Sequence, residues 1–174
     1  MSEPRAERPD MLGYGVDTPE WRSLPWSWAA DRLAAERNFW VVTVSGAGRP
    51  HALPVWGVWD PDRWHFAFSC APSARKARNL AANPAMTVMT ESTVECLSIE
   101  GRAALVPVEE RDRREAWIDR YMVRYGPLEE NLNPDFLREN LIFEFTPDRA
   151  FAIIERADEF ATRATRWTFG PADS

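Results

Sequence analysis

The sequence predicts a mainly β protein with flanking helices, in which six to seven strands form a closed or nearly closed antiparallel barrel. Short runs of strand length recur along the chain, and turn residues separate them. Few segments, by contrast, have the spacing of an amphipathic helix. A chain of 174 residues is long enough for one domain with a sizeable core. We therefore expect a single barrel domain over residues 21–174, preceded by a flexible N-terminal arm over residues 1–20.

The first half of the chain predicts a helix followed by a β-hairpin. Residues 28–37, WAADRLAAER, have the pattern of a short amphipathic helix. Residues 39–45, FWVVTVS, form a continuous apolar run that indicates a strand buried on both faces. A turn at Gly46-Ala47-Gly48 leads to a second strand over residues 51–59. Pro54 lies within that strand and indicates an edge or a bulge, because proline cannot donate a ladder hydrogen bond.

The second half predicts alternating strands and helices. Large and small side chains alternate over residues 64–70, which indicates a strand, and Ser73 is then the expected N-cap of a helix over residues 74–82. Gly101 is the expected site of a bulge. The other expected elements are strands at residues 86–91, 94–106, 141–145 and 150–155, and helices at residues 108–125 and 133–140, with residues 163–169 as a candidate for a last strand.

Composition and motifs exclude several classes of function. Hydrophobic residues make up 45% of the chain, and its net charge of −6 argues against a nucleic-acid-binding surface. No apolar run has the length of a membrane span or of a signal peptide core, so we expect a cytoplasmic protein. Two scattered cysteines and two histidines do not indicate a zinc site. The chain has no P-loop, Rossmann or Ser-His-Asp pattern, so we assign no catalytic residue and expect a cofactor to supply any chemistry.

The most informative charges follow the strand at residues 64–70. Arg75 and Lys76 fall in the first turn of the next helix, where the positive end of the helix dipole disfavours cations. Such a pair indicates an anion held between the two side chains, most often a phosphate. Lys76 is also the only lysine among the 21 Lys and Arg residues. The alternative is two solvated charges on a surface helix.

Further candidates surround this turn. Ser69 and Cys70 have small side chains that permit close approach of a sugar or a phosphate. Asn79 follows Arg75 by four residues and is expected to face the same way, toward either a ligand or water. A nucleophilic role for Cys70 is not expected, because no partner base can be assigned.

The strand that contains Pro54 is the second candidate region. The missing N–H leaves room for a flat ligand against the backbone, and the alternative is an ordinary edge strand. Arg49 and His51 open this strand and can reach the polar groups of such a ligand. We assign His65 a structural role.

Three segments together resemble the pyridoxamine 5′-phosphate oxidase-like split β-barrel superfamily. They are FWVVTVSGAGRPHALPVWGVW, WHFAFSCAPSARKARNLAANPAMTV and IEGRAALV, and the resemblance covers residues 40–106. The S-x-R-K-x-x-N-L run that begins at Ser73 is its most specific feature. The resemblance implies an FMN-binding-like split barrel in which a flavin-type cofactor lies at a homodimer interface.

The resemblance also implies roles for individual residues. Arg75 and Lys76 would bind the cofactor phosphate, and Ser69 and Cys70 would line the phosphate and ribityl region. The stretch that would pass along the flavin-type ring consists of His51, Ala52, Leu53, Pro54 and Val55.

Within the superfamily, the R-P-H-x-x-P-V-W strand and the tail ATRATRWTF are most similar to the branch that uses the deazaflavin coenzyme F420. In that branch Arg166 and Trp167 would belong to a C-terminal segment near the cofactor. The high arginine and alanine content fits the actinobacteria in which this coenzyme is common. The chain ends in TFGPADS and lacks the basic C-terminal segment of true pyridoxamine phosphate oxidases.

The resemblance leaves three functions open. The first is a homodimeric, F420H₂-dependent reductase that acts on a small conjugated or heteroaromatic substrate, with Trp56 and Trp59 as candidates for either the pocket wall or the core. FMN in place of F420 is the alternative cofactor. The second function is a non-catalytic flavin or F420 carrier or sensor. The third is a haem-binding relative, for which His51 would be the only candidate axial ligand.

Overall fold

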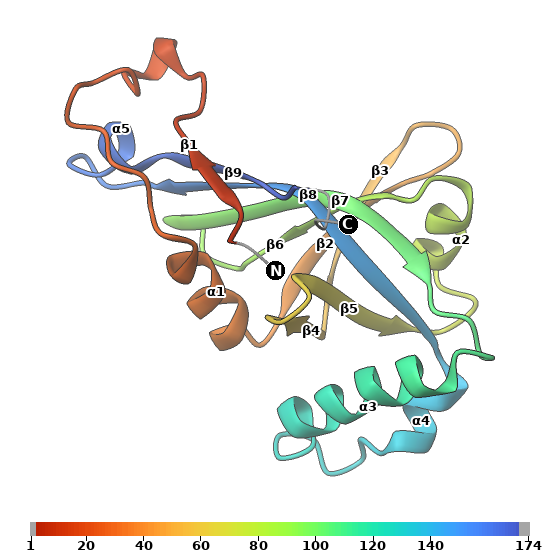
Figure 1. Cartoon of the computed structure of the whole chain (residues 1–174). Helices are drawn as coiled ribbons and strands as arrows, with labels where there is room; N and C mark the ends of the chain where they lie inside the picture. The colour runs from red at the N-terminus through yellow and green to blue at the C-terminus, as the bar shows by residue number, and fades with distance from the viewer. Residues whose placement is uncertain (1–2, 171–174) are drawn as a thin grey trace.

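The computed structural model describes residues 3–170, and within this range nine strands form one sheet in which all pairs are antiparallel (Figure 1). The strands are β1 (Arg5–Glu7), β2 (Phe39–Val44), β3 (Pro50–Val55), β4 (Gly57–Asp60), β5 (His65–Cys70), β6 (Ala85–Met89), β7 (Glu95–Leu105), β8 (Leu141–Ile154) and β9 (Thr165–Thr168). The helices are α1 (Trp26–Ala35), α2 (Arg75–Ala82), α3 (Arg111–Tyr125), α4 (Pro134–Glu139) and α5 (Phe160–Arg163), with a 3₁₀ turn η1 at Leu12–Tyr14.

The sheet is open rather than closed, as in a split barrel. Its main order is β1-β9-β8-β7-β6-β2-β3, and β5 joins it by pairing with both β8 and β4. Strand β8 is the branch point, because its first part pairs with β5 and its last part with β9. Strands β3 and β4 are consecutive in sequence, and no ladder joins them in the described chain. The predicted antiparallel barrel is therefore confirmed in its open form.

The break between β3 and β4 corrects the prediction of one strand over residues 51–59. Trp56 separates the two strands. Its carbonyl accepts a hydrogen bond from the Tyr121 hydroxyl (2.7 Å), and the N–H of Gly57 donates to the Tyr125 hydroxyl (2.9 Å). Because α3 supplies these partners, the backbone at this point is satisfied without a strand neighbour.

Strand β8 corrects the prediction of two short strands near its position. It runs without interruption through Pro147, which lies opposite Gly101 of β7 at a shift in register. The bulge expected at Gly101 is thus confirmed, and it accommodates the proline. A Cβ atom at Gly101 would lie 2.1 Å from the carbonyl oxygen of Thr146, so the close approach of the two backbones requires glycine.

Strand β2 is buried on one face, which corrects the prediction of burial on both. Phe39, Val41 and Thr43 are fully buried, whereas Trp40 is 41% exposed. Burial alternates along β2, so Phe39, Val41 and Thr43 share the inner face and Trp40 lies on the outer one. Within the first twenty residues, for which the sequence predicts a flexible arm, the structure places β1 beside β9.

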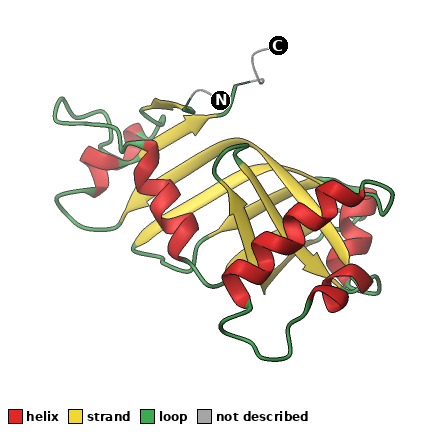
Figure 2. Cartoon of the chain, turned by 60° about the horizontal axis from the view of Figure 1, so that its bottom comes forward, coloured by secondary structure: helices red, strands yellow, loops and turns green. Residues whose placement is uncertain are grey.

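Two clusters of buried side chains form the core. The larger one lies between α1 and the sheet and includes Trp26 of α1 and Trp167 of β9, whose rings meet edge to face at 5.5 Å. The smaller one lies under α3, where Trp117, Tyr121 and Tyr125 are buried as their spacing of four residues predicts. Figure 2 shows α3 lying across the strands on which it packs. No helix within residues 3–170 has the length and hydrophobicity needed to cross a membrane.

Candidate functional site

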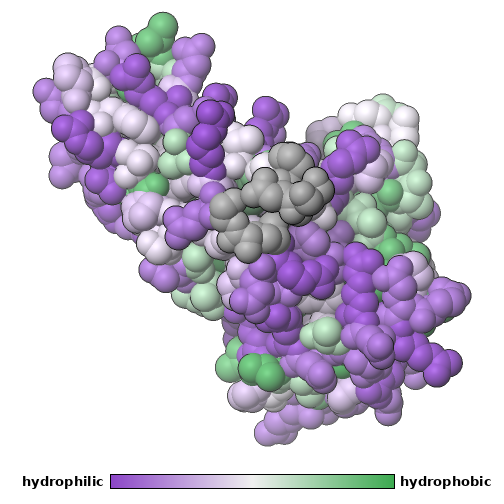
Figure 3. All heavy atoms as spheres, viewed as in Figure 1, coloured by the Kyte–Doolittle hydropathy of each residue, from purple (hydrophilic) through white to green (hydrophobic). Residues whose placement is uncertain are grey.

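A pocket of about 410 Å³ lies where the β3–β4 break, the end of β5, α2 and α4 meet. Its lining residues are Pro54, Val55, Trp56, Ser69, Cys70, Ala71, Ala74, Lys76, Tyr121, Leu132, Phe136, Leu137 and Asn140. Five of these are residues that the sequence predicts to bind a cofactor: Pro54, Val55, Ser69, Cys70 and Lys76. In Figure 3, weakly polar and apolar residues gather over the region of β3 and α2, whereas the surface of α3 and α4 is mainly hydrophilic.

The first turn of α2 forms one side of the pocket. Ala74 rather than Ser73 is the N-cap residue, which corrects the predicted cap. Alanine offers no side-chain acceptor, so the first backbone N–H groups of α2 have no side-chain cap. Lys76 is half-buried and lines the pocket, whereas the neighbouring Arg75 is exposed and lies outside the lining. Of the two predicted phosphate-binding cations, Lys76 therefore lines the pocket in the single chain and Arg75 does not.

Ser69 and Cys70 at the end of β5 form the floor beside Lys76. The Oγ atom of Ser69 is buried and has no hydrogen-bond partner within the described residues. Burial raises the pKa of the Cys70 thiol, and the Lys76 ammonium only partly opposes this shift. The thiol thus stays protonated at neutral pH. A hydroxyl without a partner beside an ammonium group fits an anionic ligand that accepts hydrogen bonds.

Tyr121 holds two walls of the pocket together. Its hydroxyl accepts a hydrogen bond from the N–H of Ser69 (2.9 Å) and donates one to the carbonyl of Trp56 (2.7 Å). Burial raises the pKa of Tyr121 well above its ordinary value, so the hydroxyl keeps the proton that it donates. The end of β5 and the β3–β4 break are therefore fixed relative to each other by one side chain of α3.

Replacing Tyr121 with phenylalanine is expected to lower the free energy of unfolding by roughly 1–2 kcal/mol, because two buried backbone groups lose their partner. Urea denaturation measures this change. Tyr14→Phe is the matched control, since the Tyr14 side chain is 68% exposed, and it should alter stability by less than about 0.5 kcal/mol. Equal stability of the two variants would show that the Tyr121 bridge contributes nothing.

The other residues predicted on β3 and before it lie outside this pocket. Strand β3 is at the edge of the sheet, as Pro54 indicates, and Pro54 is paired with Trp40. Ala52 and Leu53 are exposed, as is Arg49 in the preceding turn, whereas His51 is half-buried. In the single chain the ring-binding stretch predicted at residues 51–55 is thus an open strand edge that reaches the pocket at its end.

Three predicted residues do not face the pocket. Asn79 is 5% exposed and donates to the Thr43 hydroxyl at 2.9 Å, so it joins α2 to β2 instead of contacting a ligand or water. Trp167 is fully buried in the larger core cluster. Arg166 forms an ion pair with Glu7 of β1 at 2.9 Å. Both residues of β9 pair with the last part of β8, whereas the pocket lies at its beginning.

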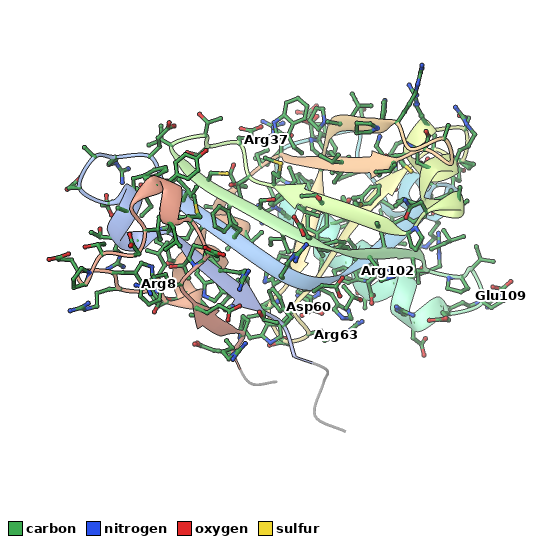
Figure 4. All side chains as sticks on the ribbon, turned by 90° about the horizontal axis from the view of Figure 1, so that it is seen from above. Arg8, Arg37, Asp60, Arg63, Arg102 and Glu109 are labelled. Atoms are coloured by element: carbon green, nitrogen blue, oxygen red, sulfur yellow. The ribbon has the colours of Figure 1, made fainter. Side chains whose placement is uncertain are left out.

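The buried carboxylate of Glu144 holds α3 against β8, and α3 in turn carries the pocket residue Tyr121. Glu144 of β8 is 3% exposed, and four side chains contact it at 2.6–2.8 Å: Arg63, His65, Arg113 and Trp117. Burial alone would raise the pKa of Glu144, but hydrogen bonds from His65, Arg113 and Trp117 outweigh it and hold the pKa far below its ordinary value. Figure 4 shows Arg63 beside Asp60 at the turn between β4 and β5. The structural role predicted for His65 agrees with this contact.

Sequence reasoning missed one wall of the pocket. Tyr121, Phe136, Leu137 and Asn140 come from α3, from α4 and from the residue after it. Helical spacing predicts that Tyr121 is buried, but it does not reveal which backbone groups its hydroxyl contacts. The sequence did indicate that the Tyr121 hydroxyl needs a hydrogen-bond partner, because a buried tyrosine hydroxyl requires one.

The fold and the pocket define a split-barrel protein with a cationic site at a helix N-terminus. A family model described as pyridoxamine 5′-phosphate oxidase matches residues 29–153, which is more than half of the chain. The chain belongs to this family. No curated protein matches it.

Solved structures with low sequence identity share the fold. The heme storage protein HutZ from Vibrio cholerae has a TM-score of 0.59 and 20% identity, over 71% of this chain and 91% of that one. A protein described as an F420 reductase has a TM-score of 0.54 and 21% identity, over 69% and 93%. The conserved hypothetical protein Rv2991 from Mycobacterium tuberculosis has a TM-score of 0.63 and 17% identity, over 90% and 95%.

Proposed function

We propose that the chain is an F420H₂-dependent oxidoreductase that binds its cofactor at a homodimer interface and reduces a small conjugated or heteroaromatic substrate. The pocket carries this proposal. It combines the only lysine of the sequence, an uncapped helix N-terminus and a buried serine hydroxyl that has no hydrogen-bond partner among residues 3–170. Membership of a family named for an oxidase of a phosphorylated substrate, and the fold shared with an F420 reductase, support the same class.

Each group at the α2 end of the pocket has a part in holding the cofactor. The Lys76 ammonium and the first N–H groups of α2 would bind the phosphate, because both provide positive charge and hydrogen-bond donors. The Ser69 hydroxyl would donate to a phosphate or ribityl oxygen and so gain the partner that it lacks. When bound, a reduced deazaflavin supplies the hydride. Trp56 and the apolar lining would exclude water from the transfer.

FMN is the alternative cofactor, since its phosphate would fit the same groups. A non-catalytic carrier would also use this pocket, so turnover separates it from a reductase. The haem-binding alternative has less support, although HutZ shares the fold. One of the two histidines, His65, is already in contact with Glu144, and the other, His51, lies on β3 outside the pocket.

The homodimer is supported by an apolar row on the outer face of β2 and β3. Side chains alternate along a strand, so Trp40 and Val42 point away from the core on β2. Their partners across the ladder are Pro54 and Ala52 of β3. A second chain packed on this row would cover Trp40, which is 41% exposed. It would also lie beside residues 51–55 at the edge of the sheet.

We therefore expect the native protein to sediment with twice the 20.0 kDa mass of the chain, and Trp40→Asp to shift it to the monomer. Val123→Asp is the control, because Val123 is 80% exposed on α3, away from this row, and its replacement should leave the dimer intact. A native protein that sediments as a monomer at micromolar concentration would contradict the dimer.

Fluorescence titration of the purified protein with F420, and separately with FMN, tests the cofactor. Tight binding of F420 alone supports the proposal, and preference for FMN moves the chain to the flavin-dependent alternative. Consumption of the reduced cofactor in the presence of a conjugated acceptor then distinguishes a reductase from a carrier. Binding of neither cofactor would remove the functional assignment and leave the fold.

A further inference from the structure

Arg114 is a buried cation that lies outside the pocket. It belongs to α3, it is 6% exposed, and it does not line the cavity. Its guanidinium makes three hydrogen bonds within the described residues, and each acceptor is a backbone carbonyl rather than a carboxylate. Burying a charge without an ionic partner is costly, so the segments that Arg114 contacts indicate what it is for.

The three carbonyls lie at the end of β7 and at the end of α4. The guanidinium donates to the carbonyl of Val106, just after β7, at 3.3 Å, and to those of Arg138 and Asn140 at 3.2 Å and 3.1 Å. The last carbonyls of a helix have no partner within the helix, and the helix dipole favours a cation near them. Arg114 therefore satisfies the C-terminal end of α4 and fastens it to α3 and to the end of β7.

Helix α4 depends on such contacts because it is short. It has six residues, and so short a helix is not stable by itself in water. Leu137 anchors it through apolar packing, since this side chain is 2% exposed and belongs to the core cluster beneath α3. An ion pair between Arg138 and Glu115 also joins α4 to α3, but the two side chains are 48% and 43% exposed and contribute little. The buried contacts of Arg114 are thus the polar anchor of α4.

The position of α4 matters because this helix forms one wall of the pocket. Phe136, Leu137 and Asn140 all line the cavity. The backbone carbonyl of Asn140 accepts from Arg114, and its side chain donates to the carbonyl of Phe136 at 2.7 Å. The guanidinium therefore holds one lining residue directly and a second one through Asn140.

We propose that Arg114 is a positioning residue that holds α4 closed against the pocket and so shields the bound cofactor from water, without taking part in phosphate binding. This inference rests on the proposed function, in which the phosphate lies at Lys76 and the lining excludes water. Affinity and shielding then depend on different residues. Loss of Arg114 should let α4 open locally, because local opening occurs where few contacts hold an element in place.

Quenching of cofactor fluorescence by acrylamide measures this shielding. The protein is saturated with oxidised F420, or with FMN if the titration selects it, and acrylamide is then added. Arg114→Met keeps an unbranched side chain but donates no hydrogen bond, and it should raise the quenching constant of the bound cofactor by about threefold or more. The dissociation constant of the cofactor should change by less than about twofold, because Lys76 is untouched. Arg114→Lys should give an intermediate quenching constant, since an ammonium group keeps the charge but lacks the planar fork of donors.

Arg138→Met is the matched control, because it removes a cation from α4 itself and leaves the contacts of Arg114 in place. It should leave both constants close to those of the native protein. Urea denaturation establishes that each variant is folded in the assay, and Arg114→Lys decides the outcome if Arg114→Met does not fold.

Native-like quenching in the Arg114 variants, or quenching raised equally by Arg138→Met, would overturn the inference while the cofactor assignment stands. A loss of affinity as large as that of Lys76→Ala would also overturn it, because the effect of Arg114 would then not be confined to shielding. Failure of both cofactors to bind would instead remove the proposed function, and the inference with it.

Discussion

Replacing Glu144 with alanine is expected to lower the free energy of unfolding by about 3 kcal/mol at neutral pH. Removing one partner from a buried ionic group typically costs about 3–5 kcal/mol. Here the lower end applies, because the side chains of Arg63 and Arg113 are 43% and 37% exposed and can turn toward water. Trp117 cannot do so, since it is 1% exposed and its indole N–H donates to Glu144.

Glu100→Ala is the matched control for this prediction. Glu100 of β7 also forms an ion pair, with Arg149 at 2.6 Å, but the two side chains are 51% and 62% exposed. Surface pairs contribute about 0–1 kcal/mol, so the control should lose much less stability than Glu144→Ala. Urea denaturation at pH 7 measures the free energy of unfolding of both variants. Similar losses would show that the buried cluster around Glu144 stabilises the fold no more than a surface ion pair does.

The same carboxylate makes stability depend on acid. The pKa of Glu144 in the folded chain lies well below its ordinary value, so the unfolded chain binds the proton more readily. The contribution of Glu144 is therefore fully present above the ordinary pKa of a glutamate and is lost as the pH falls below it. Between pH 7 and pH 3 the native protein should lose more stability than Glu144→Gln, which cannot bind that proton.

Replacing Lys76 with alanine is expected to weaken binding of the phosphate-bearing cofactor by 10- to 100-fold. A hydrogen bond to a charged group contributes about 1.5–3 kcal/mol, and among the described lining residues Lys76 alone carries an ammonium group. Lys76→Arg should bind with intermediate affinity, because a planar guanidinium replaces a compact charge. Fluorescence titration with F420 and with FMN gives the affinities.

Two further variants separate the local effect of Lys76 from that of net charge. Arg111→Ala removes one positive charge from the exposed first turn of α3, outside the pocket, and should leave cofactor affinity unchanged. Arg75→Ala tests the other member of the predicted pair, which is exposed in the single chain. A small effect would assign the phosphate to Lys76 alone, and a large one would place Arg75 in the site in the assembled protein. Native-like affinity of Lys76→Ala would remove the phosphate assignment.

Local sequence patterns predicted most of the elements because each pattern depends on neighbours along the chain. The spacing of Trp117, Tyr121 and Tyr125 predicted α3 and its buried face. Gly101 was the predicted bulge, and Pro54 marked the edge strand. These two predictions depend on an atom or group that one residue lacks, the Cβ atom in Gly101 and the backbone N–H in Pro54. The sequence alone shows that this atom or group is missing.

The predictions that failed depended on groups far away in the sequence. One strand was expected over residues 51–59, but hydroxyls of α3 interrupt it at Trp56. Asn79 was expected to contact a ligand or water, yet it is buried and donates to the hydroxyl of Thr43, which is 36 residues away on β2.

The sequence by itself determined the family, the mainly β fold and the cationic turn at the start of α2. Tertiary structure alone decided that Lys76 rather than Arg75 lines the pocket, and that α4 forms its opposite wall. The physical reason is that the walls of the pocket come from segments that are far apart in the sequence. Tyr121 joins its walls by hydrogen bonds to Ser69 and Trp56, which are 52 and 65 residues away along the chain. Periodicity reports which side chains are buried, whereas a cavity depends on which distant segments those side chains meet.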